Sequence, residues 1–296
     1  MTPRALYPAH RGYVAPAAAS AEVWRLGLGI VLASAGYLAL GQMFVQQVSV
    51  LSGGVPAARL FDGTRPGGML LLLSSFGCML AATFIVVRLL HRRGVATLFG
   101  PLPLALRQGA AVGVLLALLG LALMVLPPWD AGGPLVPNLG LGTWLLLLIP
   151  AIPALLVQVG AEEVFFRGYI QQQLAARFAS PLVWMVLPAG LFALGHYLPD
   201  TAGPNAGAIA LWSGLFGLLM ADLTARAGTL GPAIAVHFYN NFTAMLLVSM
   251  PDDLGGLALY HAPFGMDDTA RIAAWMPVEF AHAVVAWLAA RLAIRA

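Results

Sequence analysis

The sequence predicts an all-α protein, a polytopic membrane helical bundle with about eight transmembrane helices. Of its 296 residues, 60% are hydrophobic and only 9% are charged, whereas about one quarter of a soluble domain is charged. Mean hydropathy is +0.86, and apolar runs of about 20 residues, long enough to cross a bilayer, recur along the chain. This composition excludes a soluble globular protein. The formal charge of +3 is too small to indicate nucleic-acid binding, so the expected surroundings are the lipid bilayer.

Each predicted span is an apolar run, and several are bounded by residues typical of turns. The first span, 26–46, precedes Ser52-Gly53-Gly54, the second, 68–87, follows Pro66-Gly67, and the third, 108–127, ends at Pro127-Pro128. The fourth, 143–166, runs into charged residues at its end, and the seventh, 229–250, stops before Pro251. The fifth, sixth and eighth spans are predicted at 181–198, 206–222 and 272–294.

Arginine positions predict the orientation, because basic residues accumulate on the cytoplasmic side of short loops. With the N-terminus inside, every arginine except Arg59, Arg65 and Arg271 falls on the cytoplasmic side. We therefore expect a multi-pass protein of the cell membrane with both termini cytoplasmic. Residues 1–25 are the expected cytoplasmic N-terminal tail and residues 26–296 the transmembrane bundle. The residues indicate no oligomeric state.

Charged residues inside apolar spans are candidates for function, since a charge at mid-bilayer costs about 2.5–3.5 kcal/mol on insertion scales. Glu162 and Glu163 follow the apolar run 145–159 with no turn signal between them. Residues four apart share a helix face, so Arg167 is expected to pair with Glu163 and to leave Glu162 without a local partner. Such a carboxylate suits a general base. An ion cluster at a helix end explains this pattern, taken alone, equally well.

Two further polar groups lie on later spans. His196 stands among apolar neighbours on the fifth span, where a buried structural histidine is the simpler interpretation. His237 and Asn241 are four residues apart on the seventh span, so both can donate hydrogen bonds to one point and stabilise an oxyanion. Polar contacts between helices explain that pair slightly better when it is considered alone.

In combination, a carboxylate, two imidazoles and a carboxamide supply the groups needed for amide hydrolysis by water. The patterns Glu162-Glu163-xxx-Arg167, Phe192-xxx-His196 and His237-xxx-Asn241 follow one another on successive helices. They resemble the motifs of the CPBP family of intramembrane proteases, which includes the CAAX prenyl endopeptidases and the bacterial Abi-type proteins. The resemblance covers residues 143–250, which it predicts to be the catalytic core.

The resemblance implies an endopeptidase that hydrolyses a peptide bond of a membrane-associated protein or peptide. Glu162 would activate the attacking water with help from His196, and His237 and Asn241 would form the oxyanion site. Glu163 and Arg167 would form a supporting pair. The resemblance to the CAAX endopeptidases suggests a lipidated substrate. The composition, however, is of bacterial type, and bacteria generally lack that processing pathway, so we expect only that the substrate is membrane-associated.

A metal is left open by the same resemblance, because proteins of this family are often described as metalloproteases. Glu162, His196 and His237 are the candidate ligands for a divalent ion such as zinc. The sequence has no His-Glu-x-x-His run of the zinc type. A glutamate mechanism without an obligatory metal is slightly favoured, and no cofactor is assigned.

The predicted fourth span creates a conflict of depth. If it ended near Glu162 and the fifth began near residue 181, His196 would lie about 22 Å deeper at about 1.5 Å per residue. We therefore expect a longer fourth helix, from about Pro150 to Arg177, that carries Glu162 towards mid-membrane.

Other functions compete with this one. The segment around Ser213 is similar to the serine segment of rhomboid proteases, although small residues there also suit close helix packing. A non-enzymatic membrane scaffold or a bacteriocin-immunity protein with the same fold is the main alternative. A transporter is less favoured, because no pair of interrupted helices marks a substrate path. The pairs Asp222–Arg226 and Glu279–His282 have helical spacing and are interpreted as structural.

Overall fold

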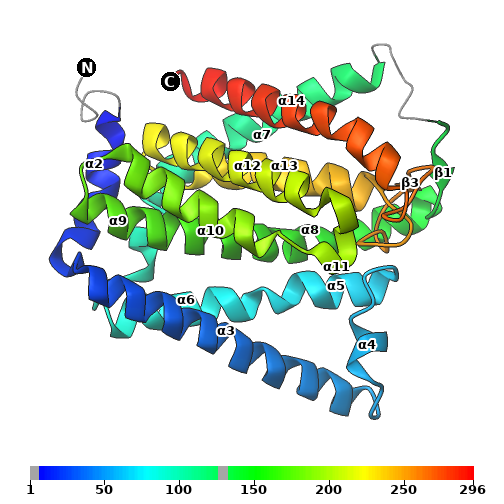
Figure 1. The fold of residues 1–296 in the computed structure, drawn as a ribbon, viewed down its shortest axis with the longest axis horizontal. Coiled ribbons are helices and arrows are strands. Elements are labelled where there is room, and N and C mark those ends of the chain that lie inside the picture. The colour runs from blue at the N-terminus through cyan, green and yellow to red at the C-terminus, as the bar shows by residue number, and fades with distance from the viewer. Residues whose placement is uncertain (1–6, 126–132) are drawn as a thin grey trace.

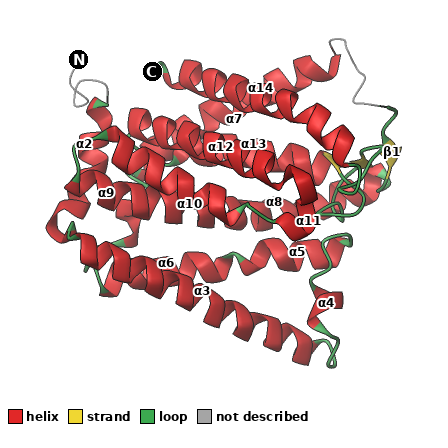
Figure 2. Cartoon of the chain, viewed as in Figure 1, coloured by secondary structure: helices red, strands yellow, loops and turns green. Residues whose placement is uncertain are grey.

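The computed structural model describes residues 7–125 and 133–296, and these residues form a helical bundle as predicted (Figure 1). Helices dominate the described residues, and the strands among them are short (Figure 2). The α-helices are α2 (Pro8–Val14), α3 (Val23–Leu51), α4 (Ala57–Leu60), α5 (Pro66–Ser75), α6 (Gly77–Leu89), α7 (Leu102–Val125), α8 (Leu141–Glu163), α9 (Gln172–Arg177), α10 (Leu187–Gly195), α11 (Pro199–Ala202), α12 (Ala206–Ala227), α13 (Gly231–Phe242) and α14 (Thr269–Ile294). Tighter 3₁₀ turns are η1 (Ala15–Ser20), η2 (Val95–Leu98) and η5 (Gly203–Asn205), and wider π-helical segments are η3 (Val164–Gln171), η4 (Leu182–Val186) and η6 (Thr243–Leu247).

Six helical stretches within the described ranges are long and apolar enough to cross a membrane. They are Val23–Leu51, Pro66–Leu89, Val95–Val125, Leu141–Arg177, Pro199–Ala227 and Thr269–Ile294. Each contains one predicted span, except that residues 126 and 127 of the third span lie outside the described residues. The polytopic bundle is thus confirmed, whereas the count of eight full-length spans is not.

The remaining two predicted spans are helical but shorter than predicted. The fifth extends only from Leu182 to Gly195, and the residue before Pro199 has a non-helical backbone, as a following proline favours. The seventh extends from Gly231 to Leu247, where the chain becomes extended and enters a strand. Both segments therefore end earlier than their apolar sequences suggest.

The fourth helix is as long as the depth argument requires. α8, η3 and α9 form one stretch from Leu141 to Arg177, so the extension beyond Glu162 is confirmed. Over residues 161–174 every side chain is buried except the half-buried Phe166. This half of the helix is therefore surrounded by neighbouring elements, among them α6, α10, α12 and α13.

Three apolar clusters surround that buried helix. One contains Val164 and joins it to α3 and α6, a second contains Phe216 and joins α7, α12, α13 and α14, and a third contains Val159 and joins α5 and α8. The acidic residues Glu162 and Glu163 lie in sequence between Val159 and Val164, so they are placed where the clusters meet.

A small sheet lies at the end of the bundle away from the two termini (Figure 1). Its strands are β1 (Val136–Pro137), β2 (Val248–Ser249) and β3 (Tyr260–His261), in the order β1-β3-β2. β1 pairs with β3 in the antiparallel sense, with Val136 opposite His261, and β2 pairs with β3 in the parallel sense, with Val248 opposite Tyr260. The sheet holds the segment that precedes α8 against the segment that follows α13.

Part of the predicted N-terminal tail packs against the bundle. α2 and η1 occupy residues 8–20, and the Tyr13 hydroxyl donates to the carbonyl of Leu98 at 2.6 Å. The His91 ring lies 3.0 Å from Ser20 Oγ through Nδ1 and 2.9 Å from the Tyr169 hydroxyl through Nε2. Burial lowers the pKa of His91 to about 4, so this imidazole is neutral at physiological pH.

The crossing of α7 and α13 depends on Gly231. A Cβ at this position would lie 2.0 Å from the carbonyl oxygen of Ala105. We expect Gly231→Ala to lower the unfolding free energy by about 1–3 kcal/mol, as overpacking does. Gly207 on α12 is the matched control, because a Cβ there has no neighbour within 4 Å and alanine favours the helix. Thermal unfolding in detergent measures the stability of the Gly231→Ala and Gly207→Ala variants. Equal melting temperatures for the two would contradict the steric argument.

Candidate active site in the helical bundle

The predicted pair of Glu163 and Arg167 forms one turn of the buried helix. Arg167 Nη1 donates to Glu163 Oε1 at 2.9 Å, and the two side chains are 1% and 0% exposed. The other guanidinium nitrogen, Nη2, donates to the backbone carbonyl of Gly217 on α12 at 3.3 Å. The guanidinium also lies 4.9 Å from the centre of the Phe192 ring, which provides a cation–π contact. Arg167 thus connects η3 to both α10 and α12.

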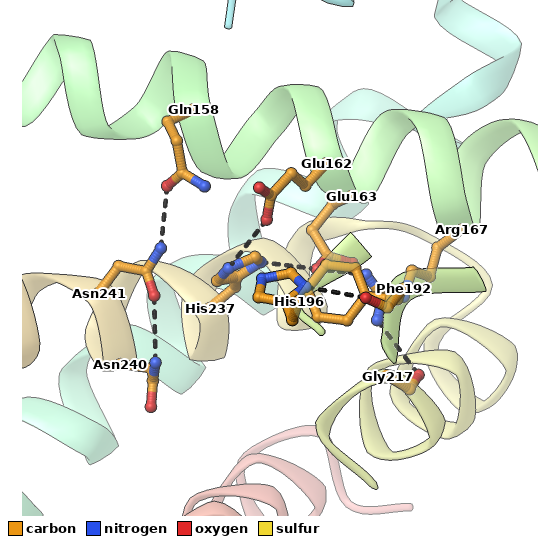
Figure 3. Close-up of polar contacts among 10 residues, drawn as sticks. All are labelled: Gln158, Glu162, Glu163, Arg167, Phe192, His196, Gly217, His237, Asn240 and Asn241. Carbon is orange, nitrogen blue, oxygen red and sulfur yellow. Dashed lines mark hydrogen bonds and ion pairs between the residues drawn. The ribbon is translucent and has the colours of Figure 1, made fainter. Parts of the chain in front are cut away.

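His237 links α13 to both carboxylates. Its Nδ1 lies 2.8 Å from Glu163 Oε1, and its Nε2 lies 3.4 Å from Glu162 Oε2. Figure 3 shows the ring between the two acids. The imidazole ring and the Arg167 guanidinium thus share Glu163 Oε1, at 2.8 Å and 2.9 Å.

Glu162 is the less enclosed of the two acids. Glu163 is fully buried, whereas Glu162 is 8% exposed, and the 3.4 Å contact with His237 is long for a hydrogen bond. The carboxylate of Glu162 is therefore held loosely enough to exchange its partner for water.

Asn241 lies one turn after His237 on α13 and faces α8. Its Nδ2 donates to Gln158 Oε1 at 2.9 Å, and its Oδ1 accepts from Asn240 Nδ2 at 3.1 Å. Gln158 was not among the predicted site residues. It stands four residues before Glu162 in an otherwise apolar run, and that spacing is the signal by which it could have been found.

His196 follows the last turn of α10. Its Nδ1 lies 2.8 Å from the carbonyl oxygen of Phe192, four residues earlier, which assigns the proton to Nδ1 and leaves Nε2 as an acceptor. The His196 and His237 rings both pack on Phe192, with centroids 4.3 Å and 6.3 Å away. Phe192 therefore brings the two imidazoles to the same region (Figure 3).

Aromatic and small residues close the site on the α12 side. The ring of Phe216 meets that of His237 with centroids 5.1 Å apart. Ser213 is fully buried, and its hydroxyl has no hydrogen-bond partner among the described residues. Ser213 is thus not paired with a histidine in the described part of the chain, as a rhomboid-like mechanism needs.

Glu162, His196 and His237 are the candidate ligands for a metal ion. Within residues 7–125 and 133–296, no three side chains of histidine, cysteine, aspartate or glutamate are grouped so as to hold one. The three candidates therefore do not form such a group in this structure.

Comparison with known proteins gives a match that covers this site. Residues 140–243 match the family described as type II CAAX prenyl endopeptidase Rce1-like. The resemblance to the CAAX proteases is confirmed. The Rce1-like segment includes the predicted residues from Glu162 to Asn241 and also Gln158. It supports a protease of the CAAX intramembrane type.

A curated relative carries no assigned role. The uncharacterized protein YyaK of Bacillus subtilis (strain 168) is 29% identical over 116 residues, which are 38% of this chain and 38% of that protein. The chain therefore matches well under half the length of this relative. No solved structure gives a significant match.

Proposed function

We propose that the protein is an intramembrane endopeptidase that hydrolyses a peptide bond of a membrane-associated substrate with water activated by Glu162. The observation that carries this proposal is the position of Glu162, within a buried helix and 3.4 Å from His237, inside the Rce1-like segment. A loosely held carboxylate beside the buried ion pair of Glu163 and Arg167 has the features of a general base.

The proposed reaction begins when Glu162 takes a proton from a water molecule. The oxygen of that water then bonds to the carbonyl carbon, and the carbonyl oxygen becomes an oxyanion. When the tetrahedral intermediate collapses, the C–N bond breaks and the proton held by Glu162 passes to the leaving nitrogen. His196 Nε2, which is free to accept a hydrogen bond, is proposed to orient the water.

Asn241 and His237 are proposed to stabilise the oxyanion. One N–H of the Asn241 carboxamide is not used by the contact with Gln158, and the Nε2–H of a protonated His237 makes only a long contact with Glu162. Donors held in place before the reaction stabilise developing charge more than mobile water does. The pair of Glu163 and Arg167 holds His237 in position through Glu163 Oε1.

The substrate is proposed to bring an apolar group into the bundle. A cavity of about 290 Å³ lies along the same helical stretch that carries Glu162. It is lined by Leu80, Phe99, Leu156, Val157, Gly160, Val164 and Ile234. Such a lining suits a hydrocarbon chain, which agrees with the lipidated substrates suggested by the resemblance.

The location is proposed to be the cell membrane with both termini cytoplasmic. The helix α2 and the C-terminal end of α14 lie at the same end of the bundle (Figure 1), as an even number of crossings between them requires. The arginine distribution supports a cytoplasmic position for that end.

The test of this proposal is cleavage by purified protein in detergent. We expect cleavage of membrane-associated peptides, faster with a peptide that carries an isoprenyl or acyl chain than with the same peptide unmodified. Addition of a chelator is expected to leave the rate unchanged, and loss of the rate with rescue by zinc would show a metal mechanism instead. No cleavage of any peptide in a broad lipidated library would favour the scaffold or immunity alternative.

A further inference from the structure

Two hydrogen bonds fix the carboxamide of Asn241 at both ends. Gln158 Oε1 accepts from Asn241 Nδ2 at 2.9 Å, and Asn240 Nδ2 donates to Asn241 Oδ1 at 3.1 Å (Figure 3). Gln158 and Asn241 are 5% and 7% exposed, so water competes little for these groups. Because an amide nitrogen has two hydrogens, one N–H of Asn241 is left over.

The two helices meet through matched pairs. Gln158 and Glu162 are one turn apart on α8, and they contact Asn241 and His237, which are one turn apart on α13. Gln158 precedes Glu162 on α8, whereas its partner Asn241 follows His237 on α13, so the two helices run antiparallel across the contact. One pair therefore sets the position of the acid and its imidazole, and the other sets the position of the carboxamide.

A carboxamide that is not held can rotate by half a turn, because the terminal torsion of asparagine is broad and roughly two-fold. Rotation would bring Oδ1 to the place of Nδ2, and an oxygen there would repel an oxyanion rather than stabilise it. Gln158 Oε1 on α8 accepts only from the nitrogen, so this rotation of Asn241 would break the bond between them unless the Gln158 carboxamide turned as well.

We infer that Gln158 is a positioning residue, which orients the Asn241 carboxamide so that its remaining N–H donates to the oxyanion. This inference rests on the proposed function and adds to it a residue that the family motifs quoted above do not contain. Asn240 assists from the other end of the same carboxamide. Neither residue needs to touch the substrate.

The test is a double-mutant cycle measured on a cleaved peptide. Asn241→Ala removes a donor to the oxyanion and is expected to lower kcat by about 10²–10³-fold. Gln158→Met keeps the length of the side chain but removes the acceptor, and is expected to lower kcat by about tenfold or more with KM within about twofold. In the double variant the two losses should not multiply, because Gln158 acts only through Asn241.

Gln171→Met is the matched control. Gln171 is a fully buried glutamine on the same helix, and its Nε2 donates to the carbonyl of Ala221 at 3.1 Å, away from Asn241. Whatever kcat loss this change causes should multiply with that of Asn241→Ala. If Gln158→Met gives an unfolded protein, Asn240→Ala tests the same coupling from a half-buried position and is also expected to be non-additive with Asn241→Ala.

The outcomes separate the inference from the proposed function. Wild-type kcat in Gln158→Met, or losses that multiply in the double variant, would overturn the positioning role while peptide cleavage stands. Full activity of a Glu162→Gln variant would instead overturn the proposed mechanism.

Discussion

Glu162→Gln is expected to lower kcat for peptide cleavage by a factor of about 10²–10⁴, the range that general-base catalysis contributes. The carboxamide has nearly the shape of the carboxylate but cannot take a proton from water. The one polar contact given for the Glu162 side chain in the described residues is the long one of 3.4 Å to His237, so the substitution removes no close hydrogen bond. Initial rates on the best peptide, together with a thermal unfolding curve, measure the effect.

Two variants serve as controls for this prediction. Glu279 is a second carboxylate on a predicted span, and its Oε1 accepts from Trp275 Nε1 at 2.9 Å, so Glu279→Gln should retain activity. Ser213→Ala should also retain activity, since the serine hydroxyl meets no histidine in the described residues. Loss of cleavage in Ser213→Ala with a fully active Glu162→Gln would replace the glutamate mechanism with a serine nucleophile.

Much of the fold could be predicted because lipid imposes a simple rule. A chain in hydrocarbon must satisfy its backbone hydrogen bonds within helices, so the apolar runs identify most spans directly. The long fourth helix was predictable from a conflict of depth between Glu162 and His196 rather than from composition. The early end of the fifth span has a signal in the sequence, because Pro199 disfavours a helical backbone at the residue before it. The early end of the seventh span at Leu247 was not predictable, since apolar residues continue past it and tertiary contacts decide where the helix stops.

The site could be predicted only where its contacts are local. Glu163 and Arg167 are four residues apart, and helix geometry alone indicates their ion pair. The bond from His237 to Glu163 joins residues 74 positions apart, and no spacing rule anticipates it. Gln158 was missed for the same reason, because its role depends on Asn241, 83 positions later. The family resemblance supplied the residues, and the structure supplies their partners.

Arg167→Met is expected to destabilise the protein by about 3–5 kcal/mol, because removing one member of a buried ion pair leaves the other charge uncompensated. Glu163 is 0% exposed and would keep only His237 as a cationic partner. Glu163 Oε2 already has no hydrogen-bond partner among the described residues, so no second donor is at hand. We expect a large fall in the melting temperature measured in detergent. Cleavage should also be lost, because His237 would move from its position.

Arg226→Met is the matched control, since Arg226 and Asp222 form another pair four residues apart on a helix, at 2.8 Å. Asp222 keeps hydrogen bonds from Tyr7 and Trp287 when the arginine is removed, and the pair is partly exposed. The stability lost in Arg226→Met should therefore be much smaller than that lost in Arg167→Met, as it is for ion pairs near solvent. If Arg226→Met and Arg167→Met melt at the same temperature, then Arg167 does not stabilise the protein by compensating the buried charge of Glu163.

The double variant Glu163→Gln with Arg167→Met separates stability from activity. Both charges are then absent, so most of the stability lost in Arg167→Met should return, as it does when a buried ion pair is replaced by neutral groups. Cleavage should not return, because His237 Nδ1 would face an amide in place of the carboxylate that holds the ring in position. A double variant that recovers both properties would mean that the ion pair only supports the helix and that His237 acts independently of Glu163.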